Sequence, residues 1–370
     1  MKFTVIRSNF LKGLSIVSKA VNSRSALPIL SNVLIRTEKG GIKLIASDLQ
    51  ITISVWIGAK IDKDGEAAVP AKVLMEYVNQ VSGDKLDGET EGASLHLRSD
   101  KSKATFAGIN SADFPDVEIS DSSNALQLEL DSAEFDKAIR LVGFSTAVDE
   151  GRPVLTGIYF KVSENTLTLA GTDGFRMAEY KMKLDKEYDE VKCIVPAKSL
   201  LETVKSFSVT SDKIQLSIDS EHNVVGIKAS DMQASLRMIE GEYPAYSAVV
   251  PSEFTTIMSI SAIEFSAGVK LANVFARDTG NMFKISLEGN NIKIYSQPSE
   301  AGNNSSELKG EVEGADIEIA FNAKYLLDFF TNVSANEIRF YSTESLKPGL
   351  FRVDELENYF YLVMPMKANW

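Results

Sequence analysis

The sequence predicts an α+β protein of three similar domains, each combining two helices with a mostly antiparallel sheet. Two observations predict it. The motif Pro-Ala-Lys at 70–72 recurs at 196–198 and, as Asn-Ala-Lys, at 322–324, so its lysines are 126 residues apart each time. Each third of the chain also shows the same succession of strand, helix, strands, helix and strands. This period is too long for a solenoid repeat, so each unit is a whole domain. With boundaries near 122 and 253, the predicted domains are 1–122, 123–253 and 254–370.

Each third opens with an alternating strand and a helix. The strands are expected at 2–7, 126–131 and 255–261, and the helices at 7–24, 131–145 and 261–277. A hairpin follows each helix, with turns at Lys-Gly-Gly, Glu-Asn and Gly-Asn-Asn, at residues 33–48, 158–173 and 282–297. Asp48 and Asp173 directly follow the second strand of the first two hairpins.

The recurring motif starts a second helix in each third, expected at 70–82, 196–206 and 322–335. Pro70 and Pro196 suit a first helical turn, and Asn322 suits an N-cap. Spacings of four and three place one apolar stripe on each helix: Leu74, Val78 and Val81; Leu200, Val204 and Phe207; Leu326, Phe330 and Val333. An acid stands four residues after each lysine, at Glu76, Glu202 and Asp328. Each pair is either a solvent-facing ion pair or a sign that the lysines share one role.

Composition excludes several classes of protein. Apolar residues make up 44% of the chain and charged residues 24%, and no stretch approaches the ~18 apolar residues of a membrane-spanning helix. The first residues lack the apolar core of a secretion signal. A single cysteine, Cys193, excludes an internal disulfide and fits a reducing cytoplasm. With only His96 and His222 beside it, and no Walker, Rossmann or nucleophile-elbow motif, we expect no metal, no cofactor and no catalytic residue.

Charge is distributed unevenly between the predicted helices and the rest of the chain. The six helices carry twelve basic and seven acidic residues, a net +5, so with a total net charge of −12 the remainder carries −17. If all six helices face one space, they form a positive lining inside an acidic shell. Such a lining can hold a polyanion through its phosphates without reading bases.

Several motifs in a fixed order identify a family. They are MKFTV at the start, LPILSNVLI at 27–35, SADFP at 111–115, GTDGFRMA at 171–178, VPAK at 69–72 and 195–198, GEYPAY at 241–246 and LVMPM at 362–366. Over its full length the chain resembles the bacterial sliding clamps, the beta subunits of DNA polymerase III. The resemblance implies the DNA clamp fold, with inner helices and outer antiparallel sheets. It also implies a head-to-tail homodimeric ring around double-stranded DNA, in the cytoplasm, serving as processivity factor of the replicative polymerase.

The resemblance further implies a partner cleft between the second and third domains. The replicative polymerase alpha subunit, the clamp loader and other proteins with a clamp-binding motif, rich in Gln and Leu, are expected to dock there. Phe175 stands where the family usually has His, and Ala248 where Arg is common. The cleft positions are Leu155, Thr172, Gly174, Phe175, Arg176, Met177, Pro244, Val249, Val363, Met364, Pro365 and Met366.

Two further surfaces follow from the resemblance. The DNA-contacting positions are Arg24, Lys72, Arg152 and Lys198. The dimer interface would join Lys101, Lys103 and Phe106 to Val274, Phe275, Glu300 and Glu307 of a second copy. We expect Phe106, Val274 and Phe275 to be apolar side chains left uncovered in a single copy.

Two alternatives remain open. One is an enzyme that binds phosphate with Asp173 and Arg176 beside the glycines of GTDGFRMA. The other is a monomeric peptide-binding scaffold that has the same cleft and no ring.

Overall fold

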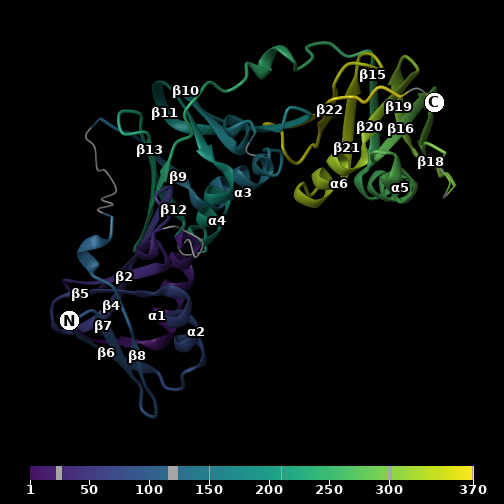
Figure 1. Cartoon of the computed structure of the whole chain (residues 1–370). Coiled ribbons are helices and arrows are strands. Elements are labelled where there is room, and N and C mark those ends of the chain that lie inside the picture. The colour runs from purple at the N-terminus through teal and green to yellow at the C-terminus, as the bar shows by residue number, and fades with distance from the viewer. Residues whose placement is uncertain are drawn as a thin grey trace. The chain divides into compact units, whose positions relative to one another are not determined.

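The structure is a computed structural model that describes residues 1–21, 27–115, 124–149, 151–209, 211–298, 300, 302–368 and 370. Its contacts divide the chain into two compact units (Figure 1). One unit contains residues Met1–Asp136 and Lys198–Met238, and the other contains Lys137–Ala197 and Ile239–Trp370. Both units include part of the predicted central domain. The predicted boundary at 122 lies outside the described residues.

The first unit is built on one long antiparallel sheet. Its strands pair in the order β8 (Lys103–Phe106), β7 (Ser94–Arg98), β6 (Lys85–Glu91), β1 (Lys2–Ile6), β4 (Ile51–Lys63), β14 (Met232–Arg237), β13 (Val224–Ala229), β12 (Lys213–Asp219) and β9 (Leu126–Asp131). β2 (Asn32–Glu38) pairs with β3 (Gly41–Ser47) and β5 (Glu66–Pro70), and β3 also pairs with β4. The pairing of β14 with β4 continues the sheet from the first predicted domain into the second.

Three α-helices lie largely or wholly in this unit. α1 (Arg7–Val17) and α2 (Ala71–Gln80) pack against each other and against the sheet, and α4 (Ala197–Phe207) precedes β12. Strand alternation sets the core. In β9, for example, Leu128 and Leu130 are buried, whereas Gln127 and Glu129 are not.

The second unit contains two antiparallel sheets. The larger has the order β10 (Gly157–Thr172), β11 (Arg176–Pro196), β23 (Tyr359–Val363), β22 (Gly349–Arg352), β21 (Glu337–Ser342), β15 (Thr256–Ser261) and β19 (Gly310–Gly314). The smaller has the order β18 (Ser305–Leu308), β17 (Asn291–Ser296), β16 (Met282–Glu288) and β20 (Ile317–Asn322). Every strand pair in the described part of the chain is antiparallel, as the sequence predicted.

Aromatic residues fill much of the second unit's core. α5 (Ala262–Ala276) and α6 (Ala323–Asn332) lie side by side (Figure 1), and α5 packs on β16, β17 and β18. The ring of Phe351 lies 5.0 Å from that of Phe340, 6.0 Å from Phe329 and 6.1 Å from Phe321, measured between centroids. Such tilted and edge-to-face pairs add stability beyond the area they bury.

The predicted helices agree with the structure, with small differences at their ends. α1, α2, α3 (Ser132–Gly143), α5 and α6 end before the predicted limits of 24, 82, 145, 277 and 335, whereas α4 ends at Phe207, just after the predicted 206. Pro70 and Pro196 are the last residues of β5 and β11, so the expectation of a proline in the first turn is wrong by one position. The Asn322 cap is confirmed, because its side-chain oxygen accepts the Lys324 N–H at 2.9 Å.

The apolar stripes of the second helices are confirmed. Each of the three is buried along its length except at Phe330, which is only half-buried. Of the predicted hairpins, β2–β3 and β16–β17 are present. The segment from Gly157 to Thr172 is instead one strand, β10. Its register with β11 shifts on both sides of Glu164, whose φ of 54° lies in the left-handed region.

Candidate partner cleft

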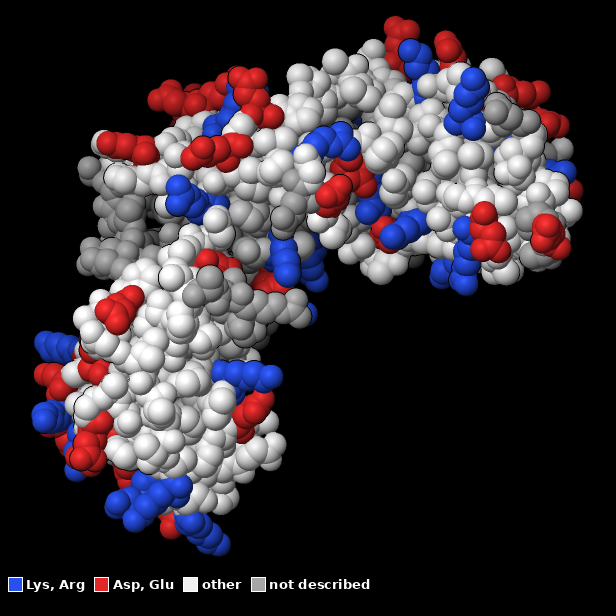
Figure 2. All heavy atoms as spheres, viewed as in Figure 1, with Lys and Arg blue, Asp and Glu red and all other residues white. Residues whose placement is uncertain are grey.

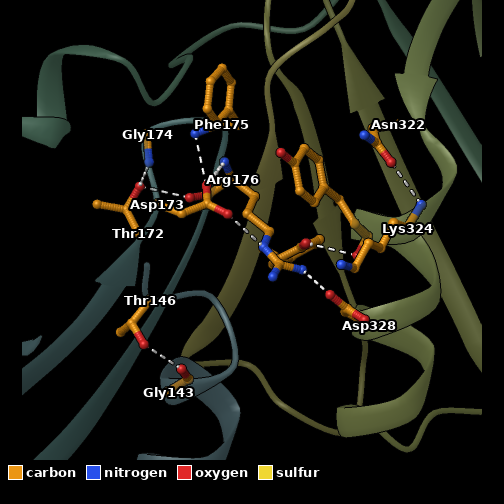
Figure 3. Close-up of polar contacts among 12 residues, drawn as sticks. Gly143, Thr146, Thr172, Asp173, Gly174, Phe175, Arg176, Asn322, Lys324 and Asp328 are labelled. Atoms are coloured by element: carbon orange, nitrogen blue, oxygen red, sulfur yellow. Dashed lines mark hydrogen bonds and ion pairs between the residues drawn. The ribbon is translucent and has the colours of Figure 1, made fainter. Parts of the chain in front are cut away.

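The loop between β10 and β11 is fixed by its own side chains. Asp173 Oδ1 accepts the N–H groups of Phe175 at 2.9 Å and Arg176 at 3.0 Å (Figure 3), and Asp48 makes the same kind of turn after β3. Thr172 Oγ1 donates to the Arg176 carbonyl at 2.6 Å and accepts the Gly174 N–H at 3.0 Å. Gly174 has a φ of 91°, which a side chain would disfavour. The sequence Thr-Asp-Gly therefore specifies a rigid turn that points Phe175 outward.

Arg176 is a buried cation held by two carboxylates. It is 9% exposed, its Nε lies 3.1 Å from Asp173 Oδ2, and its Nη1 lies 2.6 Å from Asp328 Oδ2 (Figure 3). Its guanidinium carbon lies 4.8 Å from the ring centroid of Tyr325. Burial alone would lower the pKa of Arg176, but Tyr361, Asp328 and Asp173 together raise that pKa above its ordinary value. Arg176 thus stays charged, and its side chain and that of Asp173 are both engaged in holding the fold.

The chain segment after β23 runs beside this loop. Arg176 is opposite Val363 in the β11–β23 ladder. Beyond the ladder, the Met364 N–H donates to the Phe175 carbonyl at 2.8 Å, and the Met366 N–H donates to the Ala320 carbonyl at 2.8 Å. Residues 364–366 therefore form a wall between the turn and β20.

The predicted cleft residues divide by exposure. Phe175 is 56% exposed and Val249 is 43% exposed, and Gly174 and Pro244 are exposed as well. Met364, Pro365 and Met366 are half-buried. The others are buried and form the support beneath: Leu155, Thr172, Arg176, Met177 and Val363.

An apolar cluster connects the elements of the cleft. Met177 and Leu362 form its centre, and Met364, Tyr246 and Val250 pack against it. Val250 directly follows Val249, whose N–H donates to the Tyr246 carbonyl, and the Tyr246 N–H donates to the Pro244 carbonyl. The structure thus brings the turn, the segment 244–250 and the wall 364–366 together. Leu155 lies apart from this cluster, in the short turn Pro153–Thr156, where its carbonyl accepts the Ala147 N–H.

The sequence reasoning missed Tyr325 as a member of the site. Its ring stacks on Phe175 with centroids 6.4 Å apart and planes 16° apart. A signal was present, because Tyr325 directly follows Lys324 of the third motif, where the other repeats have Val73 and Ser199. Asp328 was singled out as a partner of Lys324, but its carboxylate pairs with Arg176 instead.

The lysines of the recurring motif occupy equivalent positions. Lys72, Lys198 and Lys324 are each the second residue of their helix and each is exposed. None of the three forms the predicted ion pair with the acid four residues later in the described part of the chain. Figure 2 shows basic side chains interspersed with acidic ones on the visible face. Arg152 is exposed, and its Nη2 donates to the Asp173 carbonyl at 3.4 Å; Arg24 lies outside the described residues.

The predicted dimer contacts lie on or near two edge strands and on a helix. Lys103 and Phe106 are on β8, Glu307 is on β18, and Val274 and Phe275 are on α5. β8 pairs only with β7, and β18 only with β17, among the strands that the structure describes. Lys101, Lys103, Glu300 and Glu307 are exposed. Val274 is 58% exposed and Phe275 is half-buried. The expectation that Phe106 is uncovered is wrong, because it is 6% exposed and packs against Tyr77 with ring centroids 5.5 Å apart.

Comparison with known proteins decides the family. Models of the DNA polymerase III beta subunit match the chain in three consecutive parts: the N-terminal domain at residues 1–118, the central domain at 129–245 and the C-terminal domain at 247–367. The chain belongs to the DNA polymerase III beta subunit family. The resemblance inferred from the sequence motifs is confirmed, and with it the assignment of the chain as a processivity clamp with the α+β clamp fold.

Individual beta sliding clamps match over their full length. Those of Bacillus subtilis strain 168 and of Synechocystis are both 28% identical, over 381 and 392 residues, with at least 99% of each chain covered. The solved sliding clamp of Bacillus subtilis has a TM-score of 0.94 at 26% identity, covering 100% of this chain and 99% of that one. A Pseudomonas aeruginosa sliding clamp solved with bound griselimycin has a TM-score of 0.94 at 25% identity, with both chains covered completely.

Three further findings concern the cysteine, the groups that could bind a metal, and the helices. Cys193 is buried, and burial raises the pKa of its thiol to about 12. No group of His, Cys, Asp and Glu side chains in the described residues could hold a metal ion. None of the helices in the described part of the chain is long and apolar enough to cross a membrane.

Proposed function

We propose that two copies of this beta subunit close head to tail into a ring around duplex DNA and tether the replicative polymerase to its template. The observation that supports this best is the pair of edge strands with opposite charge. Lys103 lies on β8 and Lys101 just before it, whereas Glu307 lies on β18 and Glu300 precedes that strand.

Edge strands of this kind favour pairing with another chain. Each has backbone N–H and C=O groups with no partner strand among the described residues, and a second copy can supply one by strand addition. A heterologous contact that closes on itself uses both edges at once. Val274, which is 58% exposed on α5 beside β18, adds apolar area to that contact.

The repeated lysines fit a weak, sequence-independent grip on DNA. Lys72, Lys198 and Lys324 present exposed side chains at corresponding helix positions, and Arg24 and Arg152 are further candidates. Phosphate contacts position a protein on DNA without reading its sequence. A closed ring stays on DNA because it encircles the duplex. Each phosphate contact can therefore be weak, and the protein can slide along the DNA.

The cleft suits a short peptide segment from a partner. Exposed Phe175 and Val249 border a wall of methionines, which adapt to different apolar side chains. Partners would be the polymerase alpha subunit, the clamp loader and other proteins with a clamp-binding motif. We propose that the protein acts in the cytoplasm as a non-catalytic subunit with three domains, at 1–122, 123–253 and 254–370.

Primer extension tests the tethering function. A replicative polymerase is allowed one encounter with a primed circular template, with the clamp loader and ATP, with or without this protein. Products much longer in its presence support the proposal. Equal product lengths, with a protein that still binds the clamp-binding peptide, would indicate the monomeric scaffold instead.

A further inference from the structure

One lysine on the outer face of the four-stranded sheet, the face away from the core, is buried. Along β16, Phe283, Ile285 and Leu287 are fully buried in the core. The alternating residues point to the other face, where a lysine is ordinarily exposed. Lys284 on that face is only 8% exposed. Lys293, on the neighbouring strand β17, is exposed as expected.

Trp370 contributes to the cover over Lys284. The Lys284 ammonium lies 4.5 Å from the centroid of the Trp370 ring and donates a hydrogen bond to the Trp370 carbonyl. The ring of Tyr295 meets that of Trp370 edge to face, with centroids 5.6 Å apart and planes at 83°. In Figure 1 the end of the chain, marked C, lies beside this sheet. The interaction between a cation and the face of an indole ring is attractive, and it is stronger when the cation is shielded from water.

Lys284 also forms an ion pair within its own sheet. Its Nζ lies 2.7 Å from Glu318 Oε1 on β20, and the hydroxyl of Tyr295 donates to the other carboxylate oxygen of Glu318. Burial would raise the pKa of Glu318, but the hydrogen bonds from Lys284 and Tyr295 lower it overall. Residues of three adjacent strands therefore fix the Lys284–Glu318 ion pair in the position where Trp370 contacts it.

The described residues between the cleft and this contact are bound at three points. The Met364 N–H is bound to Phe175, the Met366 N–H is bound to Ala320, and Trp370 is bound to Lys284. Ala320 and Lys284 are opposite each other in the β16–β20 ladder. The contact of Trp370 with Lys284 and the hydrogen bond of Met366 to Ala320 thus lie on the same sheet.

We propose that Trp370 is a positioning residue that anchors the methionine wall of the cleft, residues 364–366, through its contact with Lys284. The proposal rests on the proposed role of the cleft in binding peptides. An unanchored segment would have to be ordered each time a peptide binds, and that entropy would be subtracted from the affinity. The anchor orders the segment beforehand, so the wall is in position for a partner.

The first experiment tests the anchor without any peptide. A Trp56→Phe variant of the whole protein leaves Trp370 as its only tryptophan. We expect its emission to be shifted to the blue relative to free tryptophan, and Lys284→Met to shift it to the red. Lys293→Met is the matched control, a lysine of the same sheet whose ammonium does not cover Trp370, and we expect no shift. Emission at the free-tryptophan position in the Trp56→Phe protein would overturn the anchor.

The second experiment tests the effect on the cleft. A labelled Gln-Leu-rich peptide is titrated against wild type, Trp370→Ala, Trp370→Phe, Lys284→Met and the double variant Trp370→Ala/Lys284→Met. We expect Trp370→Ala and Lys284→Met each to weaken binding about tenfold, and the double variant no further. Trp370→Phe, which keeps an aromatic face, should recover most of the affinity. Thermal unfolding of each variant identifies any loss that comes from the fold alone.

The outcomes separate the two proposals. If wild type does not bind the peptide, the cleft function fails, and the fluorescence result still decides the anchor. If wild type binds and Trp370→Ala binds equally well, the positioning role is wrong and the cleft function stands. Tighter binding by Trp370→Ala would also overturn the inference, because it would mean that the anchored segment hinders the peptide. Fully additive losses in the double variant would overturn it too, because the two residues would then act independently.

Discussion

Nη1 of Arg176 lies 2.6 Å from Oδ2 of Asp328 and so joins strand β11 to helix α6 across 152 positions of sequence. Arg176 sits beneath the proposed partner cleft, between the turn that carries Phe175 and the helix that carries Tyr325. The ion pair therefore holds the two aromatic residues of the cleft in their stacked arrangement.

We expect Asp328→Asn to lower the free energy of unfolding by about 1–2 kcal/mol. The reason is that Arg176 is buried and loses one of its two carboxylate partners, while Asp173 still pairs with it. Urea unfolding at neutral pH measures the change.

The repeat supplies a control for this variant. Glu76→Gln and Glu202→Gln change the equivalent acids of α2 and α4, which are exposed and form no ion pair in the described part of the chain. We expect each to stay within about 0.5 kcal/mol of wild type. If either variant lost as much unfolding free energy as Asp328→Asn, the acid at this position would stabilise its own helix, and the effect of Asp328→Asn would not come from the pair with Arg176.

The proposed dimer should respond to charge reversal at the two edges. Lys101→Glu with Lys103→Glu should convert the dimer to a 40.5 kDa monomer at micromolar concentration, because like charges would face each other across the interface. Glu300→Lys with Glu307→Lys should do the same. Combining all four changes should restore the dimer. Sedimentation velocity measures this, and a monomeric wild-type protein would contradict the ring.

The sequence predicted most of the fold because its patterns are local. Strand alternation, helical stripes and the 126-residue period located all six α-helices of the described chain and the recurring lysines. It could not place Phe106, because an apolar residue on an edge strand can face a partner copy or its own helix, and only the position of Tyr77 decides. It also missed the continuous β10, because the polar run Ser-Glu-Asn-Thr is typical of a turn.

DNA retention should depend on the recurring lysines. Changing Lys72, Lys198 and Lys324 together to Glu should weaken retention on DNA and lower the salt slope by about one unit for each phosphate that the protein no longer touches. The fold should persist, since all three are exposed. Lys60, Lys228 and Lys347, none of them on a helix, form a matched triple variant that should behave as wild type. Unchanged processive synthesis by the helix variant would show that these lysines do not contact DNA.

Deleting Met364–Trp370 should abolish binding of the clamp-binding peptide and leave the dimer in place. Removing an exposed apolar side chain of the cleft, with Phe175→Ala or Val249→Ala, should weaken peptide binding by on the order of 1–3 kcal/mol. Peptide titration with sedimentation as the control measures both. Equal affinities would place the partner site elsewhere.

Peptide binding by wild type should show no step near pH 6.5, because Phe175 stands where the family usually has a titrating histidine. Phe175→His should introduce one, with affinity falling below about pH 6.5 as the imidazole gains a charge next to Arg176. Titrations between about pH 5.5 and 8 compare the two proteins across that range. A step in wild type would mean that another group titrates at the site.

Cys193 should be unreactive in the native protein. Its thiol pKa is raised to about 12 by burial, against about 8.5 in an unfolded chain, so little thiolate exists near neutral pH. Its stabilising contribution is complete below about pH 8.5 and is lost as the pH rises toward about 12. Alkylation by iodoacetamide should be slow in buffer and fast in denaturant. Equal rates in both would contradict the burial.

The cleft was harder to predict than the helices because it is built from distant segments. The motifs located its residues only through the family resemblance, and the structure shows which of them are exposed. Tyr325, Asp328 and the Trp370 contact depend on tertiary packing between β11, α6 and the small sheet, which no local pattern encodes.

Encirclement of DNA is the property on which the proposed function depends. A direct measurement loads the protein onto closed circular DNA with the clamp loader and ATP, removes free protein, and then cuts the circle at one site. We expect the protein to stay with the intact circle through washing at moderate salt and to leave within minutes of the cut. Equal retention on the circle and on the linear product would mean that the protein does not hold DNA by encircling it.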